Sequence, residues 1–159
     1  NFDFDIVPML PLTLFFYGFL AAVAGLLFQA IPLILFGSET SLLAPSIGWL
    51  AGAASIEELA KLGFLGQARR RYGSTALSAV ALGGFGVGFA AVEIALLPFL
   101  LSSPIEWGPV TTTMLLHMAT VLALGLTLRR YPWPHPWLLG MLGLVILIHI
   151  GYNLFRLQA

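Results

Sequence analysis

Five long apolar segments dominate this sequence, and they restrict its possible folds more than any other feature. They span residues 8–36, 42–68, 75–101, 109–128 and 136–157. An α-helix needs about 20 apolar residues to cross the ~30 Å hydrocarbon core of a bilayer, and every segment meets that length. None shows the alternation of apolar and polar residues that is typical of a β-barrel strand. The sequence therefore predicts an all-α fold, a polytopic transmembrane helix bundle with about five spanning helices, in one domain over residues 1–159.

The composition favours the same class of protein. Hydrophobic residues make up 59% of the chain and charged residues only 9%, compared with about 25% charged residues in soluble domains. The formal net charge is zero, so no basic patch indicates nucleic acid as a partner. The absence of cysteine excludes disulfides, thiolate metal sites and cysteine nucleophiles.

The positive charges predict the orientation. Because the connections between segments are short, consecutive helices are expected to be antiparallel neighbours. Arg69–Arg71 follow the second segment and Arg129–Arg130 follow the fourth, so both groups are expected on one side of the membrane. Cytoplasmic loops are rich in arginine and lysine, so we predict that this side is cytoplasmic and that the C-terminus is outside. Arg156, near the end of the last segment, is expected to extend to the lipid headgroups.

Two carboxylates and one ammonium lie inside the second apolar segment. Glu57, Glu58 and Lys61 are surrounded in the sequence by Leu, Ala, Gly and Ile. Each charge costs roughly 2.5–3.5 kcal/mol to insert into a bilayer, and packing alone rarely accounts for such a cost. Glu57 and Lys61 are four residues apart and share a helix face, whereas Glu58 points about 100° away. We therefore expect Lys61 to pair with Glu57.

Ionisable residues in other segments fall at a similar depth. At 1.5 Å per helical residue, Glu57, His117 and His149 each lie roughly 18–20 Å from the arginine-side end of their helices. Glu93 comes out deeper, at roughly 27 Å, and joins the same layer only if its helix is tilted, kinked or begins late. Ionisable residues that converge at one depth inside a membrane are typical of a functional site.

Glycines are concentrated in the third segment, between residues 83 and 88. Gly84 and Gly88 are one helical turn apart and form a small-residue face that lets another helix approach closely. The spacing does not match a GxGxxG phosphate loop. We expect a helix contact here.

The residue types in the buried layer exclude several kinds of intramembrane chemistry. The apolar segments contain no aspartate, which excludes a paired-aspartate protease, and the chain has neither an HExxH zinc motif nor a Gly-x-Ser-x-Gly elbow. Carboxylate general-base catalysis remains. A glutamate can deprotonate water, while imidazoles either bind a metal ion or polarise a carbonyl group.

Four short motifs occur in order, each in its own segment: Glu57-Glu58-x-x-Lys61, Phe89-x-x-x-Glu93, His117 ahead of Thr120 and Gly125, and His149-x-x-x-Asn153. This ordered set resembles the motifs of PrsW-type intramembrane proteases, which belong to the wider superfamily of CAAX endopeptidases and bacteriocin-processing or abortive-infection proteins. The CAAX relatives carry an arginine near the position of Lys61 and a histidine in place of Glu93. Both departures favour the PrsW branch.

The resemblance implies catalytic roles for four residues. Glu57 is the preferred water-activating base, and Glu58 supports it or shares its proton. His149 and Asn153 complete the catalytic set, and Asn153 could donate a hydrogen bond to the tetrahedral oxyanion.

The resemblance also implies a metal ion. Glu93, His117 and His149 match the ligands of catalytic zinc, because two imidazoles and one carboxylate leave an open position for water. In the metal-free alternative, Glu93 is protonated or hydrogen-bonded to His117, while His149 and Asn153 form an oxyanion hole.

The function implied is that of an intramembrane endopeptidase that hydrolyses a peptide bond of a membrane protein, such as an anti-sigma factor. Its partners would be a membrane-protein or peptide substrate and the lipid bilayer, and its location a prokaryotic cytoplasmic membrane. Two non-enzymatic alternatives remain, a proton or ion carrier and an immunity-type binding protein. A proton relay would spread its polar residues along the membrane normal instead of gathering them in one layer.

Overall fold

The computed structural model describes residues 9–36, 47–101 and 107–156, and in these ranges the chain is helical with no strand. The helices, in chain order, are α1 (Leu10–Phe36), α2 (Ile47–Tyr72), the short 3-10 helix η1 (Ser74–Ala76), α3 (Ala79–Leu101), α4 (Trp107–Arg130) and α5 (Pro136–Arg156). The predicted all-α class with five long helices is confirmed.

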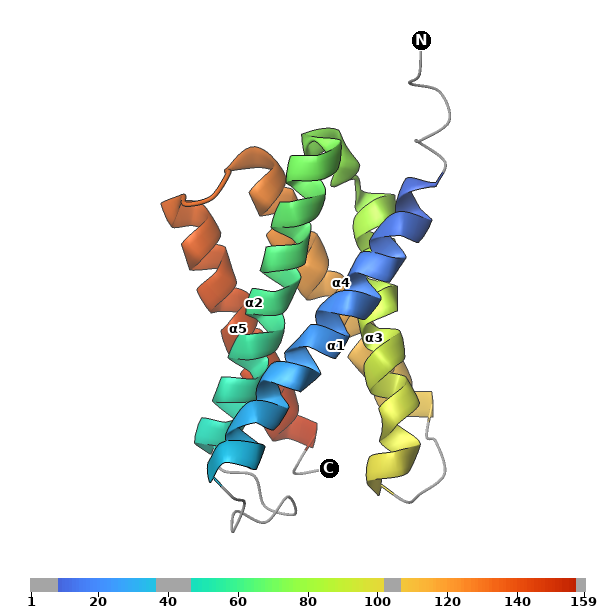
Figure 1. The fold of residues 1–159 in the computed structure, drawn as a ribbon, viewed down its shortest axis with the longest axis vertical. Helices are drawn as coiled ribbons and strands as arrows, with labels where there is room; N and C mark the ends of the chain where they lie inside the picture. Colours follow the sequence, from blue (N-terminus) through green and yellow to red (C-terminus); the bar gives the residue numbers. More distant parts are fainter. Residues whose placement is uncertain (1–8, 37–46, 102–106, 157–159) are drawn as a thin grey trace.

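The five long helices run roughly along the long axis of the molecule, and each reverses the direction of the one before it (Figure 1). The C-terminal ends of α2 and α4 therefore lie at the same end of the bundle. These ends carry Arg69–Arg71 and Arg129–Arg130, so both arginine groups lie at one end, as expected from the sequence. We call it the arginine end; its assignment to the cytoplasm stays a prediction.

Four of the helices, α1, α3, α4 and α5, are long and apolar enough to cross a membrane. The fifth, α2, has 26 residues, but its buried glutamates and lysine and its three terminal arginines lower its hydropathy. The outward faces of the bundle carry large apolar side chains such as Phe16, Phe28, Leu147 and Phe155. Such a surface is suited to contact with lipid chains.

Two helix boundaries differ from the predicted ones in a way that matters for the site. The α2 helix continues past the end of the apolar segment to Tyr72, because arginine is a good helix former. It ends at Gly73, whose φ of 82° is left-handed. The third helix begins at Ala79 instead of Thr75, after η1. The predicted helical residues 8, 42–46 and 157 lie outside the described ranges.

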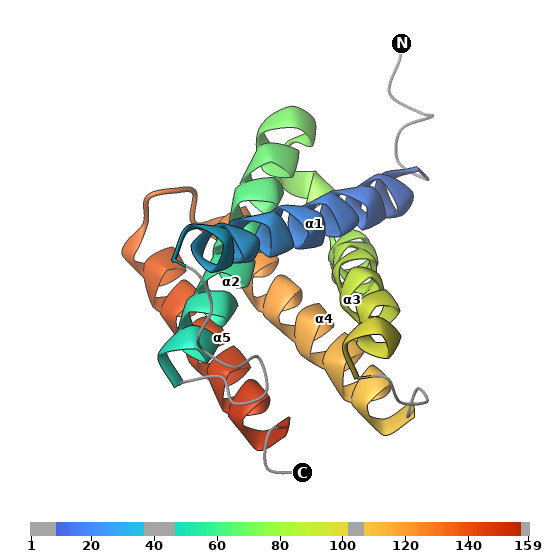
Figure 2. The ribbon, with the colours of Figure 1, turned by 60° about the horizontal axis from the view of Figure 1, so that its bottom comes forward.

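The two glycines that were predicted to form a helix contact do so. A side chain added at Gly84 would overlap the backbone carbonyl oxygen of Pro11, and one added at Gly88 would overlap that of Phe15. On the opposing helix, Gly18 lies against the carbonyl oxygen of Phe85 in the same way. Backbone therefore touches backbone where α1 crosses α3, and Figure 2 shows α1 lying across the other helices.

Beyond this crossing, α1 continues over α2. Gly25 lies so close to Glu57 that an added Cβ would be 3.7 Å from the Glu57 Cγ atom. Toward the arginine end, the buried interior is apolar and includes Leu65, Leu82, Leu124 and Leu138. The α1 helix thus covers the polar middle of the bundle, and an apolar core separates that middle from the arginine end.

Candidate functional site

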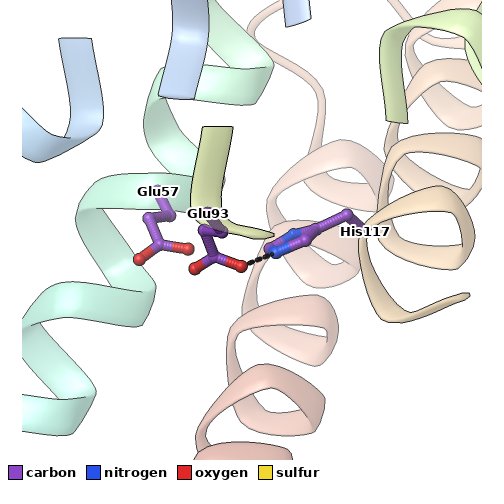
Figure 3. Close-up of side chains that lie close together, drawn as sticks. All are labelled: Glu57, Glu93 and His117. Atoms are coloured by element: carbon purple, nitrogen blue, oxygen red, sulfur yellow. Dashed lines mark hydrogen bonds and ion pairs between the residues drawn. The ribbon is translucent and has the colours of Figure 1, made fainter. Parts of the chain in front are cut away.

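All five long helices contribute to one buried polar cluster. Figure 3 shows three of its members, with Glu57 on α2 and Glu93 on α3 facing each other and His117 on α4 beside Glu93. The fully buried side chains include Glu58, Lys61 and His117, and Glu57 is only 9% exposed. Burying so many ionisable groups is costly unless each finds a partner.

The ammonium of Lys61 pairs with Glu58 and not, as expected, with Glu57. Its Nζ atom lies 2.6 Å from Glu58 Oε1, and neither side chain is exposed. Residues three and four apart are both neighbours on a helix, so helix geometry alone does not decide between the two glutamates. The decision comes from other helices, because Thr120 and His117 on α4 accept the remaining bonds of the ammonium at 3.2 and 2.8 Å.

These contacts fix the proton positions on His117. A lysine ammonium has three donors and no acceptor, so His117 Nδ1 must accept from Lys61. In a neutral imidazole the other nitrogen then carries the proton, and His117 Nε2 donates it to Glu93 Oε2 at 2.5 Å. The ring also stacks on Phe89 at a centroid distance of 4.8 Å. His117 therefore links Lys61 to Glu93, accepting a hydrogen bond from the first and donating one to the second.

Glu57 has a different environment from its neighbour. Its Oε1 atom accepts a hydrogen bond from Gln29 Nε2 on α1 at 3.0 Å. Its Oε2 atom is buried, lies 3.5 Å from His149 Nε2, and has no hydrogen-bond partner among the described residues. One oxygen of Glu57 is thus held by Gln29, while the other is buried beside His149 without a hydrogen bond to a described residue.

Glu58 is engaged through one oxygen only, and its Oε2 atom is buried without a hydrogen-bond partner among the described residues. Glu58 Oε1 accepts from both Lys61 Nζ at 2.6 Å and His149 Nδ1 at 2.8 Å. His149 on α5 consequently lies between the two adjacent glutamates of α2, with one ring nitrogen facing each. This arrangement explains why two neighbouring carboxylates on a helix can point in different directions and still share a partner.

Glu93 joins the buried layer because its helix begins late. The start of α3 at Ala79 shortens the distance from the helix start to Glu93 to roughly 21 Å at 1.5 Å per residue. This is close to the depth estimated for Glu57 and the two histidines, and the hydrogen bond to His117 places Glu93 beside them. Of the three conditions stated from the sequence, a late start is therefore the one observed.

A cavity of about 190 Å³ opens beside the cluster, and its wall includes Arg156 at the C-terminal end of α5. Its polar walls are Gln29, Glu57, Glu93, Thr113 and Arg156. Leu26 and Leu96 supply apolar walls. A water molecule occupies about 30 Å³ in the liquid, so the cavity has room for several waters or for a short stretch of peptide.

Arg156 turns toward this cavity instead of extending to the headgroups, so that expectation was wrong. Its Nη1 atom donates to Thr113 Oγ1 at 3.4 Å, and its guanidinium lies 5.8 Å from the centre of the Tyr152 ring. The Tyr152 hydroxyl is in turn hydrogen-bonded to Thr113 at 2.9 Å. A guanidinium that finds both an aromatic face and a polar acceptor inside the bundle has no need to reach the lipid surface.

Asn153 lies one turn beyond His149 on α5 and is half-buried. It takes part in none of the hydrogen bonds that join the other site residues, and it does not line the cavity. Its role as a donor to an oxyanion remains a prediction from the resemblance.

The structure groups three potential metal ligands, but they are not the predicted three. Ligand atoms of Glu57, Glu93 and His117 lie within 4.8 Å of one another. His149, the third ligand expected from the sequence, instead contacts Glu58 and Glu57. The zinc ion itself stays a prediction.

As arranged, these three side chains do not fit zinc. A metal ion needs a free lone pair on the imidazole nitrogen, and His117 Nε2 uses its proton to bond Glu93 while Nδ1 faces the Lys61 ammonium. The hydrogen bond between Glu93 and His117 is one of the two arrangements that the metal-free alternative allows.

Three residues at the site were not assigned to it from the sequence, namely Gln29, Thr113 and Tyr152. Gln29 is the only amide in the 27 residues of α1, a signal that could have marked it as a partner for a buried carboxylate. Arg156 follows His149 by seven residues, which places the two on the same helix face. That spacing could have indicated that Arg156 points inward.

Comparisons with protein-family models, with curated proteins and with solved structures find no significant match to this chain. The fold and the cluster define a class, a polytopic helical membrane protein with an ionisable site between its helices.

Proposed function

We propose that this protein is an intramembrane endopeptidase in which Glu57 activates a water molecule for attack on a peptide bond of a membrane-protein substrate. The observation that carries the proposal is the state of Glu57. Its Oε2 atom, like that of Glu58, is buried without a hydrogen-bond partner among the described residues, but of the two side chains only that of Glu57 lines the cavity. A general base needs this combination of a free oxygen and access to the reacting proton.

The surroundings support Glu57 over Glu58 as the base. Glu58 is paired with the Lys61 ammonium and with His149, and it does not line the cavity. Glu57 is held by one neutral donor, Gln29, which orients the carboxylate and leaves its second oxygen free. In this proposal Glu58 and Lys61 form a support that fixes His149 beside Glu57.

The proposed reaction uses the residues of the chain alone. Glu57 Oε2 accepts a proton from water as the water oxygen attacks the carbonyl carbon, and it later gives that proton to the departing amine. Glu93 is hydrogen-bonded to His117 and forms another part of the cavity wall. No metal takes part in the proposed steps.

The position of the polar groups favours a hydrolase over a proton or ion carrier. From Lys61 to the arginine end, the buried residues of α2 are Leu62, Leu65 and Ala68. The residues of α4 and α5 that pack near them, including Leu124 and Leu138, are also apolar. A relay across the membrane would need polar groups or water in that half of the bundle.

The proposal is tested with the purified protein in proteoliposomes. The probe is a quenched fluorescent peptide with an apolar segment of about 20 residues, the length of a membrane span. Wild-type protein should release fluorescence, and the products should show one or a few internal cleavage positions by mass spectrometry. Glu57→Gln should lower kcat at least ~100-fold, because an amide cannot accept the proton.

Ser55→Ala is a matched control on the same helix. The Ser55 hydroxyl donates to the Ala51 carbonyl of its own helix at 2.7 Å and makes no contact with the cluster. Its loss should leave cleavage unchanged. Full activity of Glu57→Gln would refute the assignment of the base. No cleavage by wild-type protein of this probe, or of a panel of single-span membrane proteins, would refute the proposed function.

A further inference from the structure

The Arg156 guanidinium is the one cation that lines the cavity in the part of the chain that the structure describes. It is half-buried at the end of α5, opposite the arginine end. An arginine in the wall of a cavity that holds two carboxylates needs an explanation, because nothing in the proposed reaction has yet used it.

The guanidinium has donors to spare. Arginine offers five N–H groups, and it forms a single hydrogen bond to a described residue, the 3.4 Å contact to Thr113 Oγ1. Within the described ranges no carboxylate forms an ion pair with it, although Glu57 and Glu93 line the same cavity. The Tyr152 ring lies beside the group, with its centre 5.8 Å from the guanidinium carbon.

The cavity is small enough for one bound group to contact side chains on more than one wall. A sphere of about 190 Å³ would be roughly 7 Å across. A peptide carbonyl bound in such a space lies within hydrogen-bond or single-water distance of groups on both sides. Glu57 and Arg156 are both wall residues, so one carbonyl can be approached by the water on Glu57 and by the guanidinium together.

We infer that Arg156 is a further catalytic residue, which donates hydrogen bonds to the carbonyl oxygen of the scissile peptide bond and stabilises the oxyanion that forms there. This inference rests on the proposed function and deepens it. It assigns to Arg156 the oxyanion role that the resemblance gives to Asn153, a residue outside the cavity wall.

The movement of charge during the reaction accounts for an arginine at this position. Water loses a proton to Glu57 Oε2, its oxygen bonds to the carbonyl carbon, and the π electron pair of the carbonyl moves onto oxygen. The negative charge has then passed from Glu57 to the substrate oxygen, and the net charge of the cavity is unchanged. When the carbonyl re-forms, the C–N bond breaks and the amine takes the proton from Glu57.

The charges in the cavity also argue against an anion as the group that Arg156 binds before the reaction starts. A substrate carboxylate would enter a cavity that already holds two carboxylates and one guanidinium, and it would be repelled. A peptide carbonyl is neutral on entry and becomes negative only after Glu57 has been neutralised. Donors placed where charge develops act on the transition state and little on substrate binding.

The test separates kcat from KM with the fluorescent peptide described above. Arg156→Ala should lower kcat by about 10²–10³-fold, the usual cost of removing an oxyanion donor, with KM changed less than about threefold. Arg156→Lys keeps the charge and the apolar stem, and it should recover part of the rate. Guanidinium ion added to Arg156→Ala should restore activity partly, which a purely structural role would not allow. Arg129→Ala, at an exposed position of the arginine end, is the control for loss of one arginine.

A second measurement distinguishes the oxyanion from substrate anchoring. A peptide with a phosphinate in place of the cleaved carbonyl should lose affinity for Arg156→Ala by about the factor lost in kcat, because it imitates the tetrahedral intermediate. Equal binding to both proteins, or an effect confined to KM, would overturn the inference. If Arg156→Ala does not fold, the kcat of Arg156→Lys decides, and an unchanged value would overturn the inference. A wild-type protein without protease activity would overturn the proposed function and this inference with it.

Discussion

Lys61 and Glu58 form a fully buried ion pair, with 2.6 Å between Nζ and Oε1 and no exposed surface on either side chain. The two residues lie one turn apart on α2. The pair is hydrogen-bonded to His117 and Thr120 on α4 and to His149 on α5. It therefore couples the three helices that surround the candidate base. Removing one member leaves the other as an uncompensated buried charge.

We expect Lys61→Met to lower the free energy of unfolding by about 3–5 kcal/mol, the usual cost of breaking a buried pair. The double variant Lys61→Met with Glu58→Gln should recover a large part of this loss, because no charge is left unpaired. Unfolding by SDS in mixed micelles measures both. Leu59→Met, on an exposed position of the same helix, is the control. Additive losses in the double variant would contradict the pairing.

The crossing of α1 and α3 gives a second expectation. An alanine at Gly88 would place its Cβ against the Phe15 carbonyl oxygen, so the helices must separate. We expect Gly88→Ala to destabilise the protein by about 1–3 kcal/mol. Gly63→Ala is the matched control, because nothing lies within 4 Å of its added Cβ. It should be neutral or stabilising by up to about 1 kcal/mol, since alanine favours the helix. Equal effects at both glycines would contradict a backbone contact at Gly88.

The orientation is tested by labelling single cysteines in intact cells with an impermeant thiol reagent. Ser74→Cys lies at the arginine end and Gly108→Cys at the opposite end, and both positions are exposed. Ser74 is preferred to the neighbouring Gly73, because the left-handed φ of 82° at Gly73 disfavours a side chain there. We expect only Gly108→Cys to be labelled from outside, since arginines favour the cytoplasm. Labelling of Ser74→Cys alone would reverse the orientation.

A chelator tests the zinc ion that the sequence predicts. Because His117 shares its two nitrogens with Lys61 and Glu93, we expect cleavage to continue in 1,10-phenanthroline at the rate measured without it. Loss of activity, with recovery on adding zinc, would support the metal-assisted reaction. Metal analysis of variants would then identify the ligands. His117→Ala should lose zinc in either arrangement, whereas His149→Ala should lose it only for the ligand set predicted from the sequence.

The five helices were predictable because each apolar segment is long enough to span a bilayer. The ends of the helices were less predictable, because hydropathy marks where the apolar residues stop and not where the helical hydrogen bonds stop. The α2 helix continues through Arg69–Arg71, and it stops before Gly73 because the backbone of this glycine has a left-handed φ. The late start of α3 depends on η1, which no apolar pattern indicates.

The depth of the site was also predictable, because rise per residue is constant along a helix. The hydrogen-bond partners of the site residues were not predictable from the sequence. Whether Lys61 meets Glu57 or Glu58 depends on residues of α4 and α5 that are more than 50 positions away in the chain. The inward turn of Arg156 likewise depends on Thr113 and Tyr152, and hydropathy treats an arginine at a helix end as a surface residue.

The placement of the Lys61–Glu58 pair within one helix has a consequence for how the protein is made. Helices leave the ribosome in chain order, so α2 must enter the bilayer before α4 and α5 exist. Because its ammonium and one carboxylate are three residues apart, they neutralise each other at that moment. The remaining carboxylate, Glu57, meets Gln29 on the helix made just before it. Each of the three ionisable groups in the middle of α2 thus has a first partner already synthesised, and the histidines of the later helices complete the site.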